Sequence, residues 1–377
     1  MKTSFKIGSI YGIPILIHWT FLLIIPIFAW IIGSQMPLTV SVLSTTFGVP
    51  IDTTYLLPSI NRYVLGAFVA LGLFGGVLLH EIAHCIVAKS KGVPIHSITL
   101  LVFGGVSSMD DSSPDPRVEL PMALVGPLSS LATGLLFIVL VYAVDAAVAS
   151  GPLSGLLVFA FSYLGLLNVS LFAFNLLPAF PMDGGRVLRA VLAIRMPLPD
   201  ATRIAASVGK AFAVVFGIIG VFLLSPILIL IAFFIYIGAT QESTAIKYTF
   251  LLKDVKIGDI MTSPVMAVSP YTPVREVIDL MYTTKHLGFP VTEKGRLVGM
   301  VTLADLHKVP PIDREAMQVR DIMTRDVITL PPSAPIIEAL RVMSLRNIGH
   351  LPVTVDDQLV GIVTRTDILK VIELREI

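Results

Sequence analysis

The chain has 377 residues, of which 55% are hydrophobic and only 14% are charged. This composition excludes an ordinary soluble protein and indicates an integral membrane protein. The formal net charge of +1 argues against a nucleic-acid partner.

Charged residues divide the chain into two parts. Residues 251–377 hold 15 basic and 16 acidic residues, whereas the longer stretch 1–250 holds 12 and 10. We therefore expect a transmembrane domain over residues 1–245, a linker over 246–256 and a soluble domain after it. The expected fold class is a polytopic α-helical membrane protein of about six transmembrane helices, followed by a cytoplasmic α+β module. The expected location is a cell membrane, crossed several times.

Six apolar stretches approach the roughly 20 residues that a helix needs to cross the hydrocarbon core of a bilayer. They are residues 15–32, 63–87, 118–144, 155–174, 205–224 and 227–239. Only Ser225-Pro226 separates the last two, which fits either a hairpin between two spans or a kink in one helix. With six spans, most basic loop residues lie on one side, so both termini are expected in the cytoplasm. One merged span would instead place the soluble domain outside.

The second predicted span contains the sequence HEIAH at residues 80–84. On a helix, His80 and His84 share one face, so both imidazoles can bind one metal ion. Glu81 points about a quarter-turn away, where a carboxylate can accept a proton from water. Ionisable side chains within a membrane are costly and usually functional, so the pattern predicts a catalytic zinc site. Cys85 is expected to be a small buried helix residue and not a ligand.

A catalytic zinc usually has a third protein ligand and one open position. Asp145 lies at the opposite end of the membrane from the histidines, and His96 is better explained as a solvated loop residue. Asp183 lies in NLLPAFPMDGGR, residues 175–186, on the same side as the histidines. The prolines and glycines there interrupt the helix, and such backbone at membrane depth must be buried in protein or line a wet cavity. Asp183 is therefore the predicted third ligand of one zinc ion per chain.

The combination of HEIAH with N-x-x-P-x-x-P-x-D-G-G resembles the site-2 protease family of intramembrane zinc metalloproteases. The resemblance extends over about residues 1–245 and includes FGG at 103–105 and GPLSS at 126–130. It implies that the histidines and Asp183 hold zinc and that Glu81 is the general base. It also implies that Asn175 contacts the substrate backbone or the oxyanion, although a helix-capping amide is the plainer alternative. Family members often carry an asparagine after the Gly-Pro pair, where this chain has Ser129 and Ser130.

The reaction implied by this resemblance is hydrolysis of a peptide bond in a transmembrane protein substrate. Zinc would polarise the scissile carbonyl and lower the pKa of water, and Glu81 would carry the proton to the leaving nitrogen. Residues 95–108, IHSITLLVFGGVSS, resemble a membrane-associated sheet that could pair with an unwound substrate by strand addition. A re-entrant packing loop is the alternative for this stretch.

The soluble domain contains a repeat with a constant offset of 62 residues. IMT at 260–262 recurs at 322–324, PVT at 290–292 recurs at 352–354, and V-G-x-V-T-x-x-D at 298–305 recurs at 360–367. Three matches at one offset exclude coincidence. The two units, expected over residues 257–314 and 315–377, resemble a tandem pair of cystathionine-β-synthase (CBS) domains.

Each unit places a threonine three residues before an aspartate at a strand-to-helix junction: Thr302 and Asp305, then Thr364 and Asp367. A hydroxyl at a helix N-terminus suits a phosphate, and a carboxylate suits ribose hydroxyls. The resemblance to CBS domains implies that ATP, ADP or AMP binds between the repeats. Thr-x-x-Asp is also a plain helix cap, and many CBS pairs only dimerise, so a homodimer through this module is expected as well.

Three functions account for these features. The leading hypothesis is an intramembrane zinc endopeptidase for regulated intramembrane proteolysis, whose CBS pair gates access or senses adenine nucleotides. A CBS-regulated transporter or channel is the first alternative, but it would need polar groups spread over several spans. A receptor that keeps zinc only for structure is the second, and it would need four protein ligands.

Overall fold

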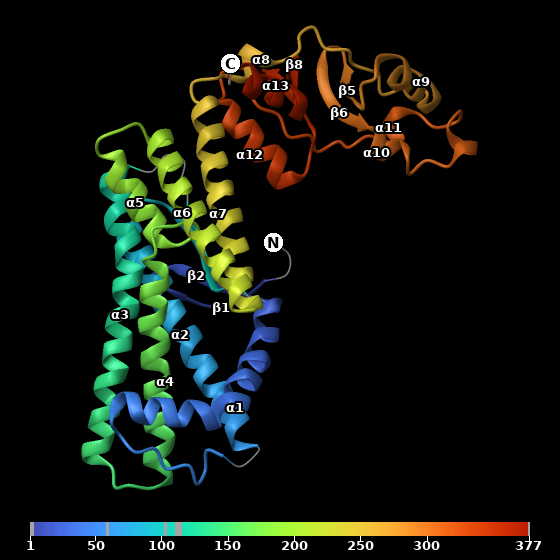
Figure 1. Cartoon of the computed structure of the whole chain (residues 1–377). Helices are drawn as coiled ribbons and strands as arrows, with labels where there is room; N and C mark the ends of the chain where they lie inside the picture. The colour runs from blue at the N-terminus through green and yellow to red at the C-terminus, as the bar shows by residue number, and fades with distance from the viewer. Residues whose placement is uncertain (1–3, 58–59, 102–103, 110–114, 376–377) are drawn as a thin grey trace. The chain divides into compact units, whose positions relative to one another are not determined.

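The computed structural model describes residues 4–57, 60–101, 104–109 and 115–375. The chain, traced in Figure 1, divides into two compact units, residues 1–246 and 247–377. Each unit has hydrophobic cores of its own, and the metal-binding residues predicted above all lie in the first.

Six helices of the described part of the chain are long and apolar enough to cross a membrane. They are α1 (Trp19–Phe47), α2 (Asn61–Ser90), α3 (Pro116–Ala147), α4 (Pro152–Asn175), α6 (Leu198–Phe222) and α7 (Pro226–Leu251). The prediction of six spans is confirmed, and Ser225 lies in a turn between two separate helices, with its N–H donating to the Gly220 carbonyl at 2.8 Å. A shorter helix, α5 (Asp183–Ala193), follows the break after α4.

The predicted first span was wrong at its start. Residues Ile13–His18 form strand β2, and α1 begins only at Trp19 and continues to Phe47. Ile13 and Ile15 are buried in this strand, so the segment is apolar because it packs on the helices, not because it crosses the bilayer. A short apolar run does not by itself distinguish a buried strand from a helix.

A four-stranded sheet completes the first unit. Its strands are β1 (Ser4–Ile10), β2, β3 (Ile95–Leu101) and β4 (Gly104–Met109), in the order β1-β2-β3-β4. The β2–β3 pair is parallel, and the other two pairs are antiparallel. Residues 95–101 and 104–109 therefore form strands and not a re-entrant loop, and β4 is an edge strand among the described residues. Phe103 of the FGG motif lies outside the described residues.

The second unit repeats its elements at the predicted offset. The first repeat has α8 (Ile257–Ile260), α9 (Val274–Thr284), β5 (Gly288–Glu293), β6 (Arg296–Thr302), α10 (Leu303–Leu306) and a 3₁₀ turn (Pro311–Asp313). The second has α11 (Val319–Ile322), α12 (Ile336–Arg346), β7 (His350–Val355), β8 (Gln358–Thr364) and α13 (Arg365–Arg375). The four strands form one sheet in the order β5-β6-β8-β7, so the repeats meet at β6 and β8.

The opening segment of each repeat packs in the core of the other repeat. Ile257 is buried in a cluster with residues of α12, β7 and β8, and its N–H donates to the Ala334 carbonyl at 2.9 Å. Val319, 62 residues later, is buried in a cluster with residues of α9, β5 and β6, and its N–H donates to the Thr272 carbonyl at 3.0 Å. Neither repeat therefore has a complete core by itself.

Candidate metal centre

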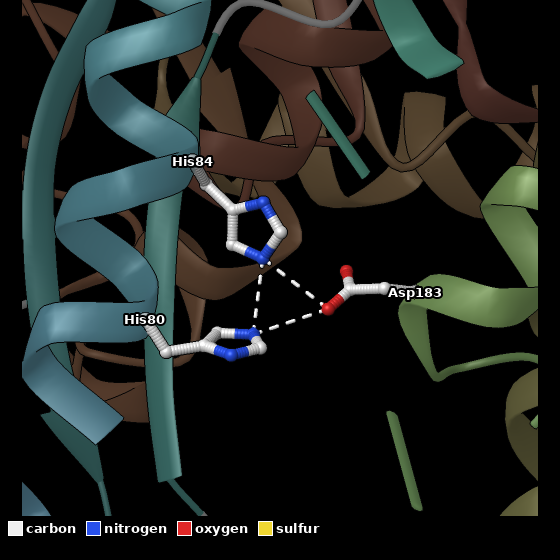
Figure 2. Close-up of side chains that lie close together, drawn as sticks. All are labelled: His80, His84 and Asp183. Atoms are coloured by element: carbon white, nitrogen blue, oxygen red, sulfur yellow. Dashed lines mark hydrogen bonds and ion pairs between the residues drawn. The ribbon is translucent and has the colours of Figure 1, made fainter. Parts of the chain in front are cut away.

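The three predicted ligands, His80, His84 and Asp183, come together in the first unit, as Figure 2 shows. Nε2 of His80 and Nε2 of His84 are 3.0 Å apart. Oδ2 of Asp183 lies 3.1 Å from the first nitrogen and 3.2 Å from the second. Both histidines are buried, and the Asp183 side chain is 15% exposed. Among the described residues, these three form the only group of His, Cys, Asp or Glu that could hold a metal ion.

Local structure explains why these side chains meet. His80 and His84 lie one turn apart on α2, so their imidazoles project from the same face. Asp183 is the first residue of α5, immediately after the loop that interrupts the membrane helices. Oδ2 of this carboxylate faces Nε2 of both histidines and can serve as the anionic ligand of a zinc ion.

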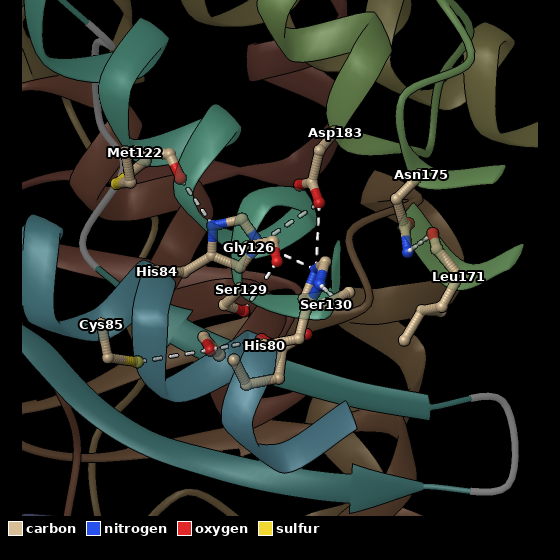
Figure 3. A network of polar contacts seen from close by, with 12 residues as sticks. His80, His84, Cys85, Met122, Gly126, Ser129, Ser130, Leu171, Asn175 and Asp183 are labelled. Atoms are coloured by element: carbon tan, nitrogen blue, oxygen red, sulfur yellow. Dashed lines mark hydrogen bonds and ion pairs between the residues drawn. The ribbon is translucent and has the colours of Figure 1, made fainter. Parts of the chain in front are cut away.

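Helix α3 determines which imidazole nitrogens face Asp183 (Figure 3). Nδ1 of His84 lies 2.6 Å from the Met122 carbonyl. Because a carbonyl oxygen can only accept, this Nδ1 carries the proton, and Nε2 of the neutral ring is an acceptor. Nδ1 of His80 lies 2.9 Å from Oγ of the buried Ser130, which can accept a hydrogen bond from a protonated Nδ1. Such outer contacts orient metal-binding histidines and select their tautomer.

The donor set fits zinc. With both Nδ1 atoms protonated, two imidazole nitrogens and a carboxylate oxygen face one point as acceptors, and a cation satisfies all three. Tetrahedral zinc with bonds of about 2.0–2.1 Å separates its ligand atoms by about 3.4 Å, close to the 3.0–3.2 Å found here. Three protein ligands leave one tetrahedral position for water or substrate, as in catalytic zinc sites.

Gly126 of α3 leaves the space that this group needs. A Cβ atom built at Gly126 would overlap Nε2 of His84 and would lie 2.8 Å from Nε2 of His80, which is closer than van der Waals contact. Any larger side chain would therefore enter the space between the ligand atoms. The GPLSS motif thus has two functions at the site, because Gly126 leaves room and Ser130 contacts His80.

Glu81 lies on α2 beside strand β4. The Ser107 hydroxyl donates to Oε2 of Glu81 at 2.6 Å, and the buried Cys85 thiol donates to Oγ of Ser107 at 3.4 Å. A Cβ atom at Gly105 of the same strand would collide with Cγ of Glu81. The edge strand therefore passes directly beside this carboxylate and holds it in one orientation.

The other predicted residues lie outside the metal-binding group. Among the described residues, neither His96 nor Asp145 belongs to it, and neither does Cys85. Asn175 is the last residue of α4, and its amide donates to the Leu171 carbonyl of the same helix at 3.0 Å. This hydrogen bond is what the helix-capping alternative predicts, and Figure 3 shows Asn175 turned toward Leu171.

Sequence reasoning missed the residues that support the ligands. The motif GPLSS contained a signal for Gly126 and Ser130, but their roles depend on how α3 packs on α2. Ser107 could be found only once β4 was placed beside Glu81. The Met122 carbonyl has no sequence signal, because every residue carries one.

In the second unit, each predicted threonine is bonded to its aspartate. The Thr302 hydroxyl donates to Oδ2 of Asp305 at 2.7 Å, and its N–H donates to the same oxygen at 3.0 Å. The Thr364 hydroxyl and N–H donate to Oδ2 of Asp367 at 2.7 and 2.9 Å. These are helix-capping contacts, formed at the junctions where nucleotide contacts were predicted.

Known proteins match both units. The model of peptidase family M50 matches residues 68–149 and 143–216, and that of the CBS domain matches 257–311 and 319–374. Zinc metalloprotease MJ0392 of Methanocaldococcus jannaschii is 34% identical over 377 residues, which cover 100% of this chain and 98% of that protein. A solved site-2 protease from the same organism is similar at 34% identity and a TM-score of 0.42, over 64% of this chain and 95% of that one. The CBS domain pair of protein MJ0100, in complex with 5′-methylthioadenosine and S-adenosyl-L-methionine, is similar at 29% identity and a TM-score of 0.29, over 31% of this chain and 98% of that one.

Proposed function

Because the chain belongs to peptidase family M50, the site-2 protease family of zinc metalloproteases, and carries a CBS pair, we propose that it cleaves membrane-anchored proteins in regulated intramembrane proteolysis. In this proposal His80, His84 and Asp183 hold the zinc ion, and Glu81 is the general base. The observation that supports it is the convergence of three ligand atoms at 3.0–3.2 Å from one another, with Glu81 on the same helix as two of them.

The chemistry divides between the metal and the side chains. Zinc supplies a Lewis acid, which polarises a peptide carbonyl and lowers the pKa of water toward about 7. Glu81 accepts the proton of the attacking water and delivers it to the leaving nitrogen. Ser107 keeps the Glu81 carboxylate in place through its 2.6 Å hydrogen bond. Asn175 is proposed to contact the oxyanion or the substrate backbone after it exchanges its hydrogen bond with Leu171.

The substrate is proposed to bind as an added strand along β4. A transmembrane helix must unwind locally before a carbonyl is available for attack, and an unwound segment can pair with the edge of a sheet. Strand β4 is such an edge, and Ser107 and Gly105 of this strand contact or adjoin Glu81. A substrate paired there would lie beside the proposed general base.

Replacement of Glu81 by Gln tests the proposed catalysis. We expect the purified variant to keep one zinc per chain and to cleave a transmembrane reporter at least about 100-fold more slowly, because general-base catalysis contributes roughly 10²–10⁴-fold. Zinc is measured by atomic emission and cleavage by gel assay. Asp145→Asn, a carboxylate outside the metal group, is the control and should retain both. Cleavage by Glu81→Gln at the control rate would refute the role of Glu81.

The CBS pair is proposed to bind ATP, ADP or AMP and to dimerise two chains. Asp305 and Asp367 are proposed to contact the ribose after they give up part of their capping contacts with Thr302 and Thr364. Asp305→Ala combined with Asp367→Ala should weaken nucleotide binding to the full-length protein at least tenfold in calorimetric titrations. Asp357→Asn, in the β7–β8 turn, should not. Equal affinities in all three proteins would refute the role of these two aspartates, and absence of nucleotide binding by the wild-type chain would leave dimerisation as the function of the pair.

Two alternatives lose their basis. The family match to a peptidase removes the transporter or channel. A purely structural zinc would need four protein ligands, and among the described residues only three gather. The orientation with both termini in the cytoplasm is part of the proposal.

A further inference from the structure

A second cluster of ionisable side chains consists of the buried Arg189 and Glu119 and the partly exposed Glu242, and it contains none of the metal ligands. Arg189 of α5 is 1% exposed. Its Nε donates to Oε1 of Glu119 of α3 at 2.9 Å, and its Nη2 donates to the same oxygen. Its Nη1 donates to Oε1 of Glu242 of α7. One guanidinium therefore joins three helices.

The burial of the Arg189 guanidinium between three helices requires an explanation. Arginine does not lose its proton in proteins, so the buried cation needs anionic partners. A buried ion pair is weak evidence for stability, because well-packed apolar residues often stabilise a protein equally well. Ionisable groups inside a membrane protein more often mark a functional element.

Arg189 lies on the same short helix as the third metal ligand. Helix α5 has 11 residues, begins at Asp183 and has no proline in it. A rigid helix of this length moves as one body, so whatever holds Arg189 also determines where the Asp183 carboxylate lies. The guanidinium carbon also sits 5.2 Å above the ring centre of Phe180, which precedes Asp183 by three residues.

Helix α7 contacts the same segment at further points. A Cβ atom at Gly238 would lie 2.6 Å from Cδ of Pro181, so α7 approaches the loop as closely as a glycine permits. Ala239 is buried in one cluster with Phe180. One turn after Gly238, Glu242 meets Arg189. Helix α7 therefore touches the chain both before and after Asp183.

We propose that Arg189 is a positioning residue for the metal centre, and that its ion pair with Glu242 transmits the position of α7 to Asp183. The proposal rests on the role of Asp183 as a metal ligand in the proposed function. Helix α7 ends at Leu251, beyond residue 247 where the second unit begins. A shift of α7 along or about its axis would therefore pull on the third ligand without touching the two histidines.

The variant Glu242→Gln tests this coupling, because it removes one charge and keeps the side-chain size. We expect the full-length protein to bind zinc about 10–100-fold more weakly, the range found when outer contacts of metal ligands are lost. The visible absorption of the cobalt-loaded protein should change, because the carboxylate ligand is displaced. In cleavage assays kcat should fall and KM should stay constant, because Glu242 lies on α7 and not on the strand β4 proposed to bind substrate. Asp200→Asn, which removes an exposed carboxylate of α6 paired with Arg203, is the matched control and should change none of these.

A second variant separates positioning from folding. Arg189→Met combined with Glu119→Gln and Glu242→Gln replaces the ion cluster by neutral side chains of similar size, which need not destabilise the protein. If this variant melts like the wild type but binds zinc weakly and has an altered cobalt spectrum, the cluster positions the ligand. Wild-type zinc affinity and cobalt spectrum in either variant would overturn the inference while leaving the proposed protease intact. A wild-type chain that binds no metal would instead overturn the proposed ligand set, and this inference with it.

Discussion

At the metal centre, Gly126 is the residue that tolerates substitution least, because a side chain there would overlap the ligand atoms. Substitution of His80 or His84 removes a predicted metal ligand, and the HEIAH motif already identifies both residues. Gly126 belongs to a different helix and binds nothing, yet its Cα faces the nitrogens of both imidazoles. The chemistry of the ligands was therefore readable from the sequence, whereas the space between them depended on how α3 packs on α2.

Gly126→Ala should abolish metal binding while the protein stays folded. The added methyl group would overlap Nε2 of His84, so one imidazole must turn away and zinc loses a ligand. We expect zinc content below about a tenth of an equivalent after purification, since loss of a ligand costs more than the 10–100-fold typical of outer contacts. Gly134→Ala, on the same helix but packed on Val169 of α4, is the comparison and should lower the melting temperature without loss of zinc. Full zinc occupancy in Gly126→Ala would contradict the geometry described here.

Helices and strands could be predicted from the sequence where their residue pattern is compatible with only one kind of structure. Long apolar runs gave α2, α3 and α4 within a few residues, because about 20 apolar residues have few other uses. Residues 15–18 were predicted to belong to the first span although they lie in strand β2 (Ile13–His18), because the partner strand β3 is about 80 residues away and leaves no local signal. In the second unit, the predicted offset of 62 residues separates α9 (Val274–Thr284) from α12 (Ile336–Arg346). No sequence pattern indicated that Ile257 packs in the core of the second repeat and Val319 in the core of the first.

This reciprocal packing predicts which repeat is destabilised by a core mutation. Ile257→Ala should increase hydrogen exchange in β7, β8 and α12 of the second repeat, and Val319→Ala should do so in β5, β6 and α9 of the first. Both side chains are fully buried, and truncation of a buried aliphatic residue costs roughly 1–5 kcal/mol. The two positions are equivalent by the 62-residue offset, so each variant is the control for the other. Exchange that rises only in the mutated residue's own repeat would show that the cores are not shared.

At the scale of the whole molecule, the first unit has six spans, and the last of them, α7, continues in sequence into the second unit. The even number of spans places both termini on one side of the membrane, and the basic loop residues predict that this side is the cytoplasm. Residues 48–57, which follow α1, are then predicted to face away from the cytoplasm, and the CBS pair to face it. Cys85, the one cysteine of the chain, is buried, so single-cysteine labelling has little background.

A membrane-impermeant maleimide should label Tyr55→Cys in intact cells, because Tyr55 is 53% exposed in the segment between α1 and α2. It should label Asp357→Cys, in the β7–β8 turn, only after the cells are permeabilised. The unmodified chain, with Cys85 alone, should remain unlabelled under both conditions. Labelling of Asp357→Cys in intact cells would reverse the proposed orientation.

The Glu119–Arg189–Glu242 cluster also has a consequence for biosynthesis. During translation the ligands His80, His84 and Asp183 all emerge well before Glu242, which lies on the last membrane helix. With the coupling inferred above, Asp183 obtains its final support only when α7 has been inserted and Glu242 meets Arg189. A nascent chain that stalls before α7 would carry every residue of the catalytic motifs and still hold zinc poorly. Proteolytic activity would then begin only after the whole membrane unit is in place.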